Sequence, residues 1–125
     1  TKGKLTNQQI RDILFGFTIC KYINSNAIVL VERSKVLGIG VGQTNRLDST
    51  IQAIKRGIKK SINKKSITLA SDGFFPFPDI IKLCKKHSIS SIIQPGGSIR
   101  DQEVIDAADE FKISMVFTGV RNFKH

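Results

Sequence analysis

The sequence has no tryptophan, one tyrosine, two cysteines, two histidines and three prolines in 125 residues. Cys20 and Cys84 stand alone, without the paired spacing of a zinc site or the number that a disulfide framework needs. We therefore expect both to be small core residues, and we expect no bound zinc. No apolar run approaches the length of about 18 residues that a membrane span requires, which argues against a membrane partner and favours a cytoplasmic setting.

What the sequence does contain is 40% hydrophobic residues and a net charge of +10. This composition is typical of a globular chain, and the length predicts a single domain over residues 1–125. Much of the charge falls between Lys55 and Lys65, but the isoleucines at 51, 54, 58 and 62 are spaced to share one helical face. A solvated helix face is therefore favoured over a nucleic-acid site.

Hydrophobic periodicity predicts alternating helices and strands. Thr6 and Gln9 form a capping-box pattern, and Ile10, Ile13, Leu14 and Phe17 then share one face of a helix that ends near Tyr22. The other predicted elements are a hairpin of strands 27–31 and 36–39, a helix after Arg46, strands at 66–70, 91–94 and 114–117, and helices at 78–87 and 101–111. These elements predict an α/β fold with a mixed sheet of five strands.

Two unusual segments surround the predicted hairpin. Asn26 precedes the first strand, where its amide serves either a polar ligand or the turn itself. The stretch "GIGVGQTNR" lacks the third glycine of a dinucleotide fingerprint, but its glycines permit close backbone approach. In it, Arg46 is suited to pair with a phosphate or a carboxylate, and a plain surface arginine is the alternative.

Two further segments follow the later strands. In "QPGGSIRD", Ser98 and Asp101 predict a reciprocal capping box at a helix start, to which a ligand role would be additional. In "ASDGFFPFPD", three phenylalanines and two prolines lie between Asp72 and Asp79. Such a loop forms either a rigid aromatic wall for a flat heteroaromatic ligand or a hydrophobic cap on the core.

Together these segments carry a resemblance that each alone does not. The segments "KYINSNAIVL", "VLGIGVGQTNRLDS", "ASDGFFPFPD", "IQPGGSIRDQEVIDAADE" and "MVFTGVRNFKH", in this order, resemble the C-terminal end of the PurH family. That family joins aminoimidazole carboxamide ribonucleotide (AICAR) transformylase to inosine monophosphate (IMP) cyclohydrolase. The resemblance runs from about Leu14 to His125, and only the lysine-rich stretch 55–66 departs from it freely.

The resemblance implies a three-layer, cytidine-deaminase-like fold without the deaminase zinc. The chain would be the second such subdomain of the transformylase, and the cyclohydrolase domain and the first subdomain would be absent from it. The whole enzyme would transfer a formyl group from 10-formyltetrahydrofolate to AICAR in purine biosynthesis, and it would act as a homodimer. This chain alone would be inactive, because the family's catalytic lysine and histidine lie upstream.

The resemblance also implies roles for individual residues. Asn26 would contact the reacting amine and formyl group as a catalytic residue. AICAR would be bound by Asn26, Arg46, Phe74, Arg121 and Phe123; the folate would be bound by Gln43, Phe77, Asp79 and Ser98; and Asp72 would belong to a structural potassium site. Lys124 stands where the family has arginine or histidine. The alternative from a different class is a free-standing basic binding module for RNA, without catalytic activity.

Overall fold

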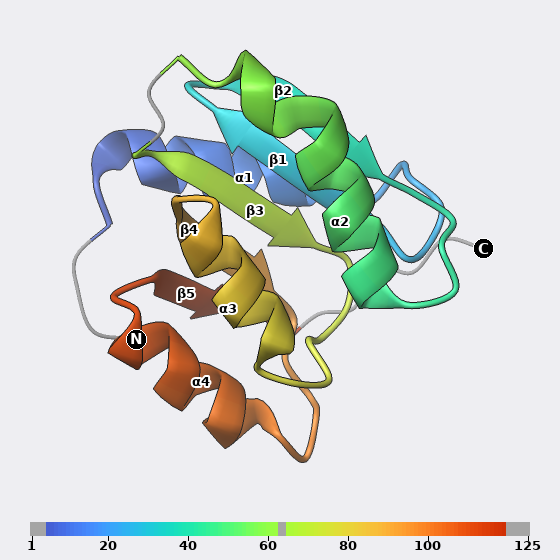
Figure 1. The fold of residues 1–125 in the computed structure, drawn as a ribbon, viewed down its shortest axis with the longest axis vertical. Helices are drawn as coiled ribbons and strands as arrows, with labels where there is room; N and C mark the ends of the chain where they lie inside the picture. Colours follow the sequence, from blue (N-terminus) through green and yellow to red (C-terminus); the bar gives the residue numbers. More distant parts are fainter. Residues whose placement is uncertain (1–4, 63–64, 120–125) are drawn as a thin grey trace.

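The computed structural model describes residues 5–62 and 65–119. In chain order the elements are α1 (Asn7–Cys20), β1 (Ile28–Glu32), β2 (Lys35–Gly40), α2 (Arg46–Gly57), the 3-10 helix η1 (Ile58–Lys60), β3 (Ile67–Ser71), α3 (Asp79–Lys86), β4 (Ile89–Gln94), α4 (Asp101–Glu110) and β5 (Ser114–Phe117) (Figure 1). Within the described residues, no helix combines the length and apolar character needed to cross a membrane.

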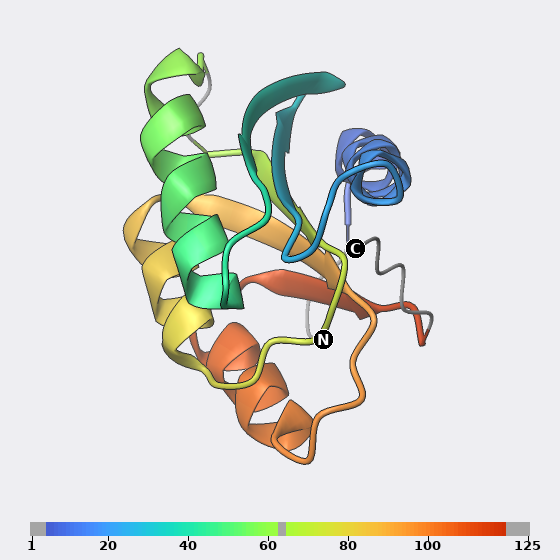
Figure 2. The same ribbon diagram turned by 90° about the vertical axis from the view of Figure 1, so that its right-hand side faces the viewer.

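The five strands form one mixed sheet in the order β2-β1-β3-β4-β5. β1 pairs antiparallel with both β2 and β3, and β3, β4 and β5 are parallel. Figure 2 shows three layers, with α1 on one face of the sheet and α2, α3 and α4 on the other. The predicted α/β class, the mixed five-stranded sheet and the three-layer arrangement are therefore confirmed.

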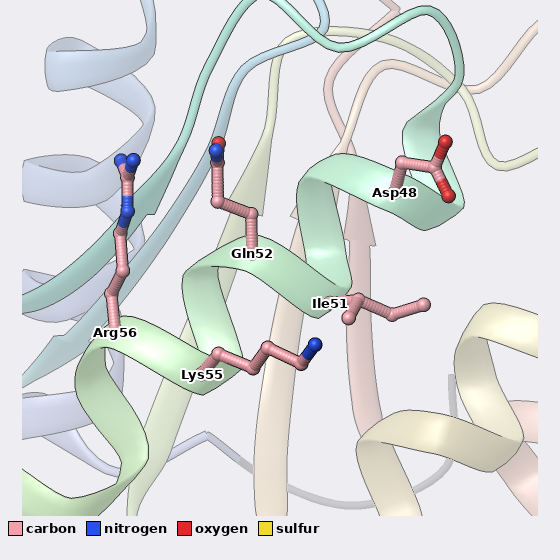
Figure 3. A pocket seen from close by; sticks show the side chains of 5 residues that line it. All are labelled: Asp48, Ile51, Gln52, Lys55 and Arg56. Carbon is pink, nitrogen blue, oxygen red and sulfur yellow. The ribbon is translucent and has the colours of Figure 1, made fainter.

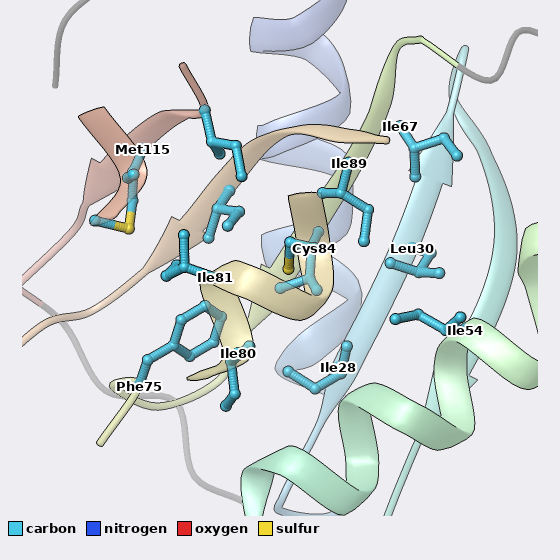
Figure 4. Close-up of a cluster of buried hydrophobic side chains, with 14 of the residues drawn as sticks. Ile28, Leu30, Ile54, Ile67, Phe75, Ile80, Ile81, Cys84, Ile89 and Met115 are labelled. Atoms are coloured by element: carbon cyan, nitrogen blue, oxygen red, sulfur yellow. The ribbon is translucent and has the colours of Figure 1, made fainter. Parts of the chain in front are cut away.

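The main hydrophobic core lies between the sheet and the three-helix layer. Phe75 is fully buried there with Ile80 and Ile81 of α3 (Figure 4). Cys20 and Cys84 are buried, as predicted. Burial raises the pKa of the Cys20 thiol to about 12 and raises the pKa of Cys84 as well, so both thiols stay protonated and unreactive at neutral pH.

The predicted capping box at Thr6 is confirmed, because Thr6 and Gln9 exchange side-chain and backbone hydrogen bonds. The predicted inward face of α1 is partly wrong. Ile13 is buried, but Ile10 and Leu14 are 42% and 60% exposed. The face of α1 that packs on the sheet includes Gly16, which approaches β3 closely: a Cβ on Gly16 would lie 2.9 Å from the Ala70 Cβ.

The isoleucine face of α2 is also shorter than predicted. Ile54 is buried, whereas Ile62 is 88% exposed. The α-helix ends at Gly57 and tightens into η1, so the 3.6-residue period that would bring Ile62 inward stops before it. Gly57 packs directly on β2, since a Cβ there would lie 2.6 Å from the backbone nitrogen of Gly38.

The hairpin turn between β1 and β2 is held by a buried carboxylate on α1. Arg33 and Ser34 both have positive φ angles, of 48° and 61°. Their backbone N–H groups donate to Asp12, at 3.1 and 2.7 Å, and Gln8 donates to the same carboxylate at 2.9 Å. Asp12 is 1% exposed, so the carboxylate that joins α1 to the turn is shielded from water.

We expect Asp12→Ala to lower the free energy of unfolding by about 1–3 kcal/mol, because two backbone donors lose their acceptor in a partly buried place. Urea denaturation followed by circular dichroism measures this. The matched control is Asp106→Ala on the exposed side of α4, whose carboxylate accepts a bond from Gln102. Equal midpoints for the two variants would contradict the role given to Asp12.

Candidate functional site

The segments that the sequence analysis singled out meet at one edge of the sheet. β2, β3, β4 and β5 all end at this edge and β1 begins there, because Ile28 pairs with both Gly40 and Ser71. The segment before β1 and the loops after β2, β3 and β4 are therefore neighbours. α2, α3 and α4 begin at the same edge, since each follows one of these loops. Ligands of open α/β sheets characteristically bind at such an edge.

A buried ion pair lies at the centre of this edge. The Arg46 guanidinium, at the first residue of α2, donates through Nη1 to the Asp72 carboxylate, directly after β3. Arg46 is 8% exposed and Asp72 is fully buried. Asp72 also accepts bonds from the Ser25 hydroxyl at 2.6 Å and from the Ala27 backbone N–H at 3.1 Å. The structure therefore places Arg46 against a protein carboxylate, one of the two kinds of anion that the sequence suggested.

The side chain of Asn26 is attached to this pair. Its Oδ1 accepts from Arg46 Nη2 at 2.8 Å, and its Nδ2 donates to the Gln43 carbonyl at 2.9 Å. Its backbone carbonyl accepts from the Ser49 hydroxyl at 2.6 Å. Asn26 is half-buried, so the carboxamide is fixed on the protein side and still reaches the surface.

The glycines of "GIGVGQTNR" serve helix packing. A Cβ on Gly40 would lie 1.8 Å from the Ser49 carbonyl oxygen, and one on Gly38 would lie 2.3 Å from that of Ala53. The predicted close backbone approach is confirmed, and the group that approaches is α2. Gln43 follows in the loop as a half-buried residue whose side chain donates to the Val41 carbonyl at 3.2 Å.

The loop after β3 has one phenylalanine in the core and others nearer the surface, so each of the two interpretations, a cap on the core and a wall for a ligand, fits part of it. Phe75 is a core residue, and its backbone N–H donates to the buried Gln94 side chain at 3.1 Å. Phe77 is 49% exposed, Phe74 is half-buried and Asp79 is exposed at the first turn of α3. The loop thus anchors itself through one ring and leaves other side chains at the surface.

The predicted capping box of Ser98 and Asp101 is half correct. The Asp101 carboxylate accepts from the backbone N–H groups of Gly97 and Ser98, at 2.8 and 3.0 Å. The reciprocal bond is absent from the described contacts, because the Ser98 hydroxyl accepts from the Arg100 N–H instead. Gly96 has a φ of 74°, and a Cβ on it would lie 2.8 Å from the Phe117 ring, so the turn requires glycine.

Arg100 is a residue of this edge that the sequence analysis did not single out. Its guanidinium carbon lies 5.0 Å from the centre of the Phe77 ring, which joins the loop before α4 to the loop before α3. It also pairs with Glu103 at 3.0 Å. Its position two residues after Ser98 was the available signal, but only the fold shows that Phe77 is beside it.

The ligand roles given to the site residues stay predictions, and two of these residues have no described position. Arg121 and Phe123 lie outside the described residues. Potassium at Asp72 stays a prediction, and both oxygens of that carboxylate already accept protein hydrogen bonds. Across residues 5–62 and 65–119, no three histidine, cysteine or acidic side chains cluster as a metal site would require.

Three hollows were identified on the described surface. The largest of these three, about 390 Å³, runs along the outer side of α2 between Asp48 and Arg56 (Figure 3). Two of its lining residues bond the backbone of β2 or of the residue that follows it: Arg56 donates to the Ile39 carbonyl at 3.2 Å, and Gln52 accepts from the Val41 N–H at 2.8 Å. None of the described residues that are expected to bind AICAR or folate lines this hollow.

Comparisons with known proteins agree with the fold and with the motifs. The model of the AICARFT/IMPCHase bienzyme family matches residues 1–56. The bifunctional purine biosynthesis proteins PurH of Clostridium acetobutylicum and Brachyspira hyodysenteriae are 50% and 46% identical to all 125 residues. The chain spans only 24% and 23% of their lengths.

Solved structures show the same architecture at low identity. The dCMP deaminase of cyanophage S-TIM5 has a TM-score of 0.63 at 14% identity, covering 91% of this chain and 100% of that one. RibD of Acinetobacter baumannii has a TM-score of 0.58 at 10% identity, covering 88% of this chain and 33% of that one. The cytidine-deaminase-like fold is therefore confirmed. The whole chain is therefore similar to about a quarter of a PurH protein, and its first 56 residues match the AICARFT/IMPCHase bienzyme family.

Proposed function

We propose that the chain is the second, substrate-binding subdomain of an AICAR transformylase that acts in purine biosynthesis in the cytoplasm. The observation that carries this proposal is the fixed carboxamide of Asn26 beside an aromatic loop, at the ligand-binding edge of the sheet. The name of the relatives, bifunctional purine biosynthesis protein, supports it. IMP cyclohydrolase activity, a homodimeric assembly and 10-formyltetrahydrofolate as co-substrate belong to the same proposal.

The proposed reaction moves one formyl group between two nitrogens. A bond forms between the 5-amino nitrogen of AICAR and the formyl carbon, the bond from that carbon to N10 of the folate breaks, and one proton passes from the amine to N10. An aromatic amine is a weak nucleophile, so orientation and stabilisation of the developing oxyanion dominate catalysis. The Asn26 amide is suited to both tasks because it donates and accepts hydrogen bonds.

Proton transfer needs a group that the described site does not supply. His87, the histidine of the described residues, caps the C-terminal end of α3, at the opposite edge of the sheet. In this proposal the chain contributes binding and orientation, and the lysine and histidine come from the remainder of a transformylase. Within this scheme Phe74 packs on the AICAR heterocycle, and Phe77, Asp79, Ser98 and Gln43 face the folate.

The RNA-binding alternative gains no support from the relatives reported above. The lysines that suggested it also have a simpler explanation. Lys55 lies in the last turn of α2 and Lys59 in η1, next to the negative end of the helix dipole. Lys85 and Lys86 occupy the same place on α3.

The test is isothermal titration of the folded chain with AICAR. We expect Phe74→Ala to weaken binding by at least about tenfold, because a stacked ring is lost. Phe77→Ala is the matched control from the same loop, and it should leave AICAR affinity unchanged while weakening binding of a folate analogue. Equal loss of AICAR affinity in both variants, or no binding to the folded chain at millimolar AICAR, would contradict the proposal.

A further inference from the structure

Asp72 is connected to Asn26 through Arg46, which donates hydrogen bonds to both side chains. The carboxylate is fully buried and receives donors from Ser25, Ala27 and Arg46. Three segments that are distant in sequence therefore meet on one side chain. An opposite charge and hydrogen bonds compensate such a buried carboxylate for the contacts with water that it has lost.

The chain of bonds continues from Asp72 to the candidate catalytic amide. Arg46 donates hydrogen bonds through both terminal nitrogens of its guanidinium. Nη1 donates to Asp72 and to the Ser71 hydroxyl at 3.2 Å, and Nη2 donates to Asn26 Oδ1 at 2.8 Å. The planar guanidinium fixes the angle between these bonds, which a lysine ammonium does not do. The position of the Asp72 carboxylate therefore sets where Nη2 meets Asn26.

These contacts decide which way the Asn26 amide faces. With Oδ1 toward Arg46 and Nδ2 toward the Gln43 carbonyl, both neighbours are satisfied. A flipped amide would turn its donor toward the Arg46 donor and its acceptor toward the carbonyl, and both bonds would be lost. The described contacts use one lone pair of Oδ1 and one N–H of Nδ2, which leaves one acceptor and one donor site for a ligand.

We propose that Asp72 is a positioning residue that acts through Arg46 to hold the Asn26 carboxamide in one orientation. The catalytic significance of this orientation rests on the proposed transformylase function. The same geometry assigns a class of ligand group to the site: a neutral pair of hydrogen-bonding atoms, such as an amine beside a carbonyl. The charge of Arg46 is matched by Asp72, which favours a neutral ligand group over a phosphate at this place.

The experiment reads the Asn26 side chain directly, by 15N relaxation of its Nδ2 group in the 125-residue chain. We expect an order parameter near 0.85 in the wild type, falling below about 0.6 in Arg46→Lys and in Asp72→Asn. Arg46→Lys keeps the positive charge but loses the planar pair of donor nitrogens. It therefore still tests the proposal if Asp72→Asn fails to fold. Arg46 makes no described contact with Gln43. If Arg46→Lys breaks the hydrogen bond between Asn26 Nδ2 and the Gln43 carbonyl, the substitution has therefore acted by releasing the Asn26 side chain.

The matched control is Glu32→Gln at the far end of β1. Glu32 is also a buried carboxylate, and it accepts from the Ser61 hydroxyl and from the Ile62 N–H at 2.8 Å. It should leave the Asn26 amide ordered. An amide as rigid in folded Arg46→Lys as in the wild type, or equally loosened by Glu32→Gln, would overturn the proposal. The measurement needs no ligand, so its failure is distinguishable from a failure of AICAR binding.

Discussion

Asp72→Ala should lower the free energy of unfolding by about 3–5 kcal/mol, the cost of breaking one side of a buried ion pair. The variant leaves the Arg46 guanidinium, 8% exposed, without its compensating charge, and removes the acceptor for Ser25 and Ala27. Denaturant unfolding of wild type and variant gives the difference. The expected effect is large because the pair is buried, since an ion pair exposed to water contributes little to the free energy of unfolding.

The comparison for this prediction is an exposed ion pair in the same chain. Arg100 and Glu103 lie 3.0 Å apart, with 47% and 55% of their side chains exposed. Glu103→Ala should therefore cost at most about 1 kcal/mol. A double variant, Arg46→Met with Asp72→Leu, should recover part of the lost stability, because no charge is then left buried although the Ala27 N–H still lacks its acceptor. If Asp72→Ala were no more destabilising than Glu103→Ala, the buried pair would not have the assigned role.

Phe75→Ala should also lower the free energy of unfolding by about 3–5 kcal/mol. The ring is completely buried in the core beside α3, and its removal leaves a cavity that the surrounding isoleucines cannot fill without moving the helix. Thermal and urea unfolding of the variant measure the loss. The loop after β3 would lose its anchor in the core at the same time.

Phe77 provides the control two residues away. It is 49% exposed and contacts Arg100, so Phe77→Ala should change stability by less than about 1 kcal/mol. The pair separates the two interpretations of the aromatic loop, since one ring stabilises the fold and the other remains accessible. Similar losses in both variants would mean that Phe77 is packed in the core as well.

The sequence predicted the elements well because their patterns are local. The capping box at Thr6 and the apolar strands each depend on residues a few positions apart, and each was found within two residues of its expected bounds. The face of α1 and the position of Ile62 were missed because they depend on where a helix packs or ends. Gly16 and Gly57 settle these through contacts with other elements.

The candidate site was predicted as a set of neighbouring loops, and its connections were not. Arg46 and Asp72 are separated by 26 positions in the sequence, and no short sequence pattern around either residue indicates that they form an ion pair. The resemblance to the family suggested a ligand for each of them separately. Only the antiparallel position of β1 between β2 and β3 brings Asn26, Arg46 and Asp72 to one place.

The packing of α2 on β2 has a consequence for which substitutions the site tolerates. Gly40 allows α2 to lie so close that the backbone of Ser49 occupies the place of a missing side chain. Ser49 bonds the Asn26 carbonyl, and Arg46 of the same helix bonds the Asn26 amide. A single methyl group at Gly40 would push the helix outward and carry both partners away from Asn26. The accuracy of this polar site therefore depends on a residue that has no side chain at all.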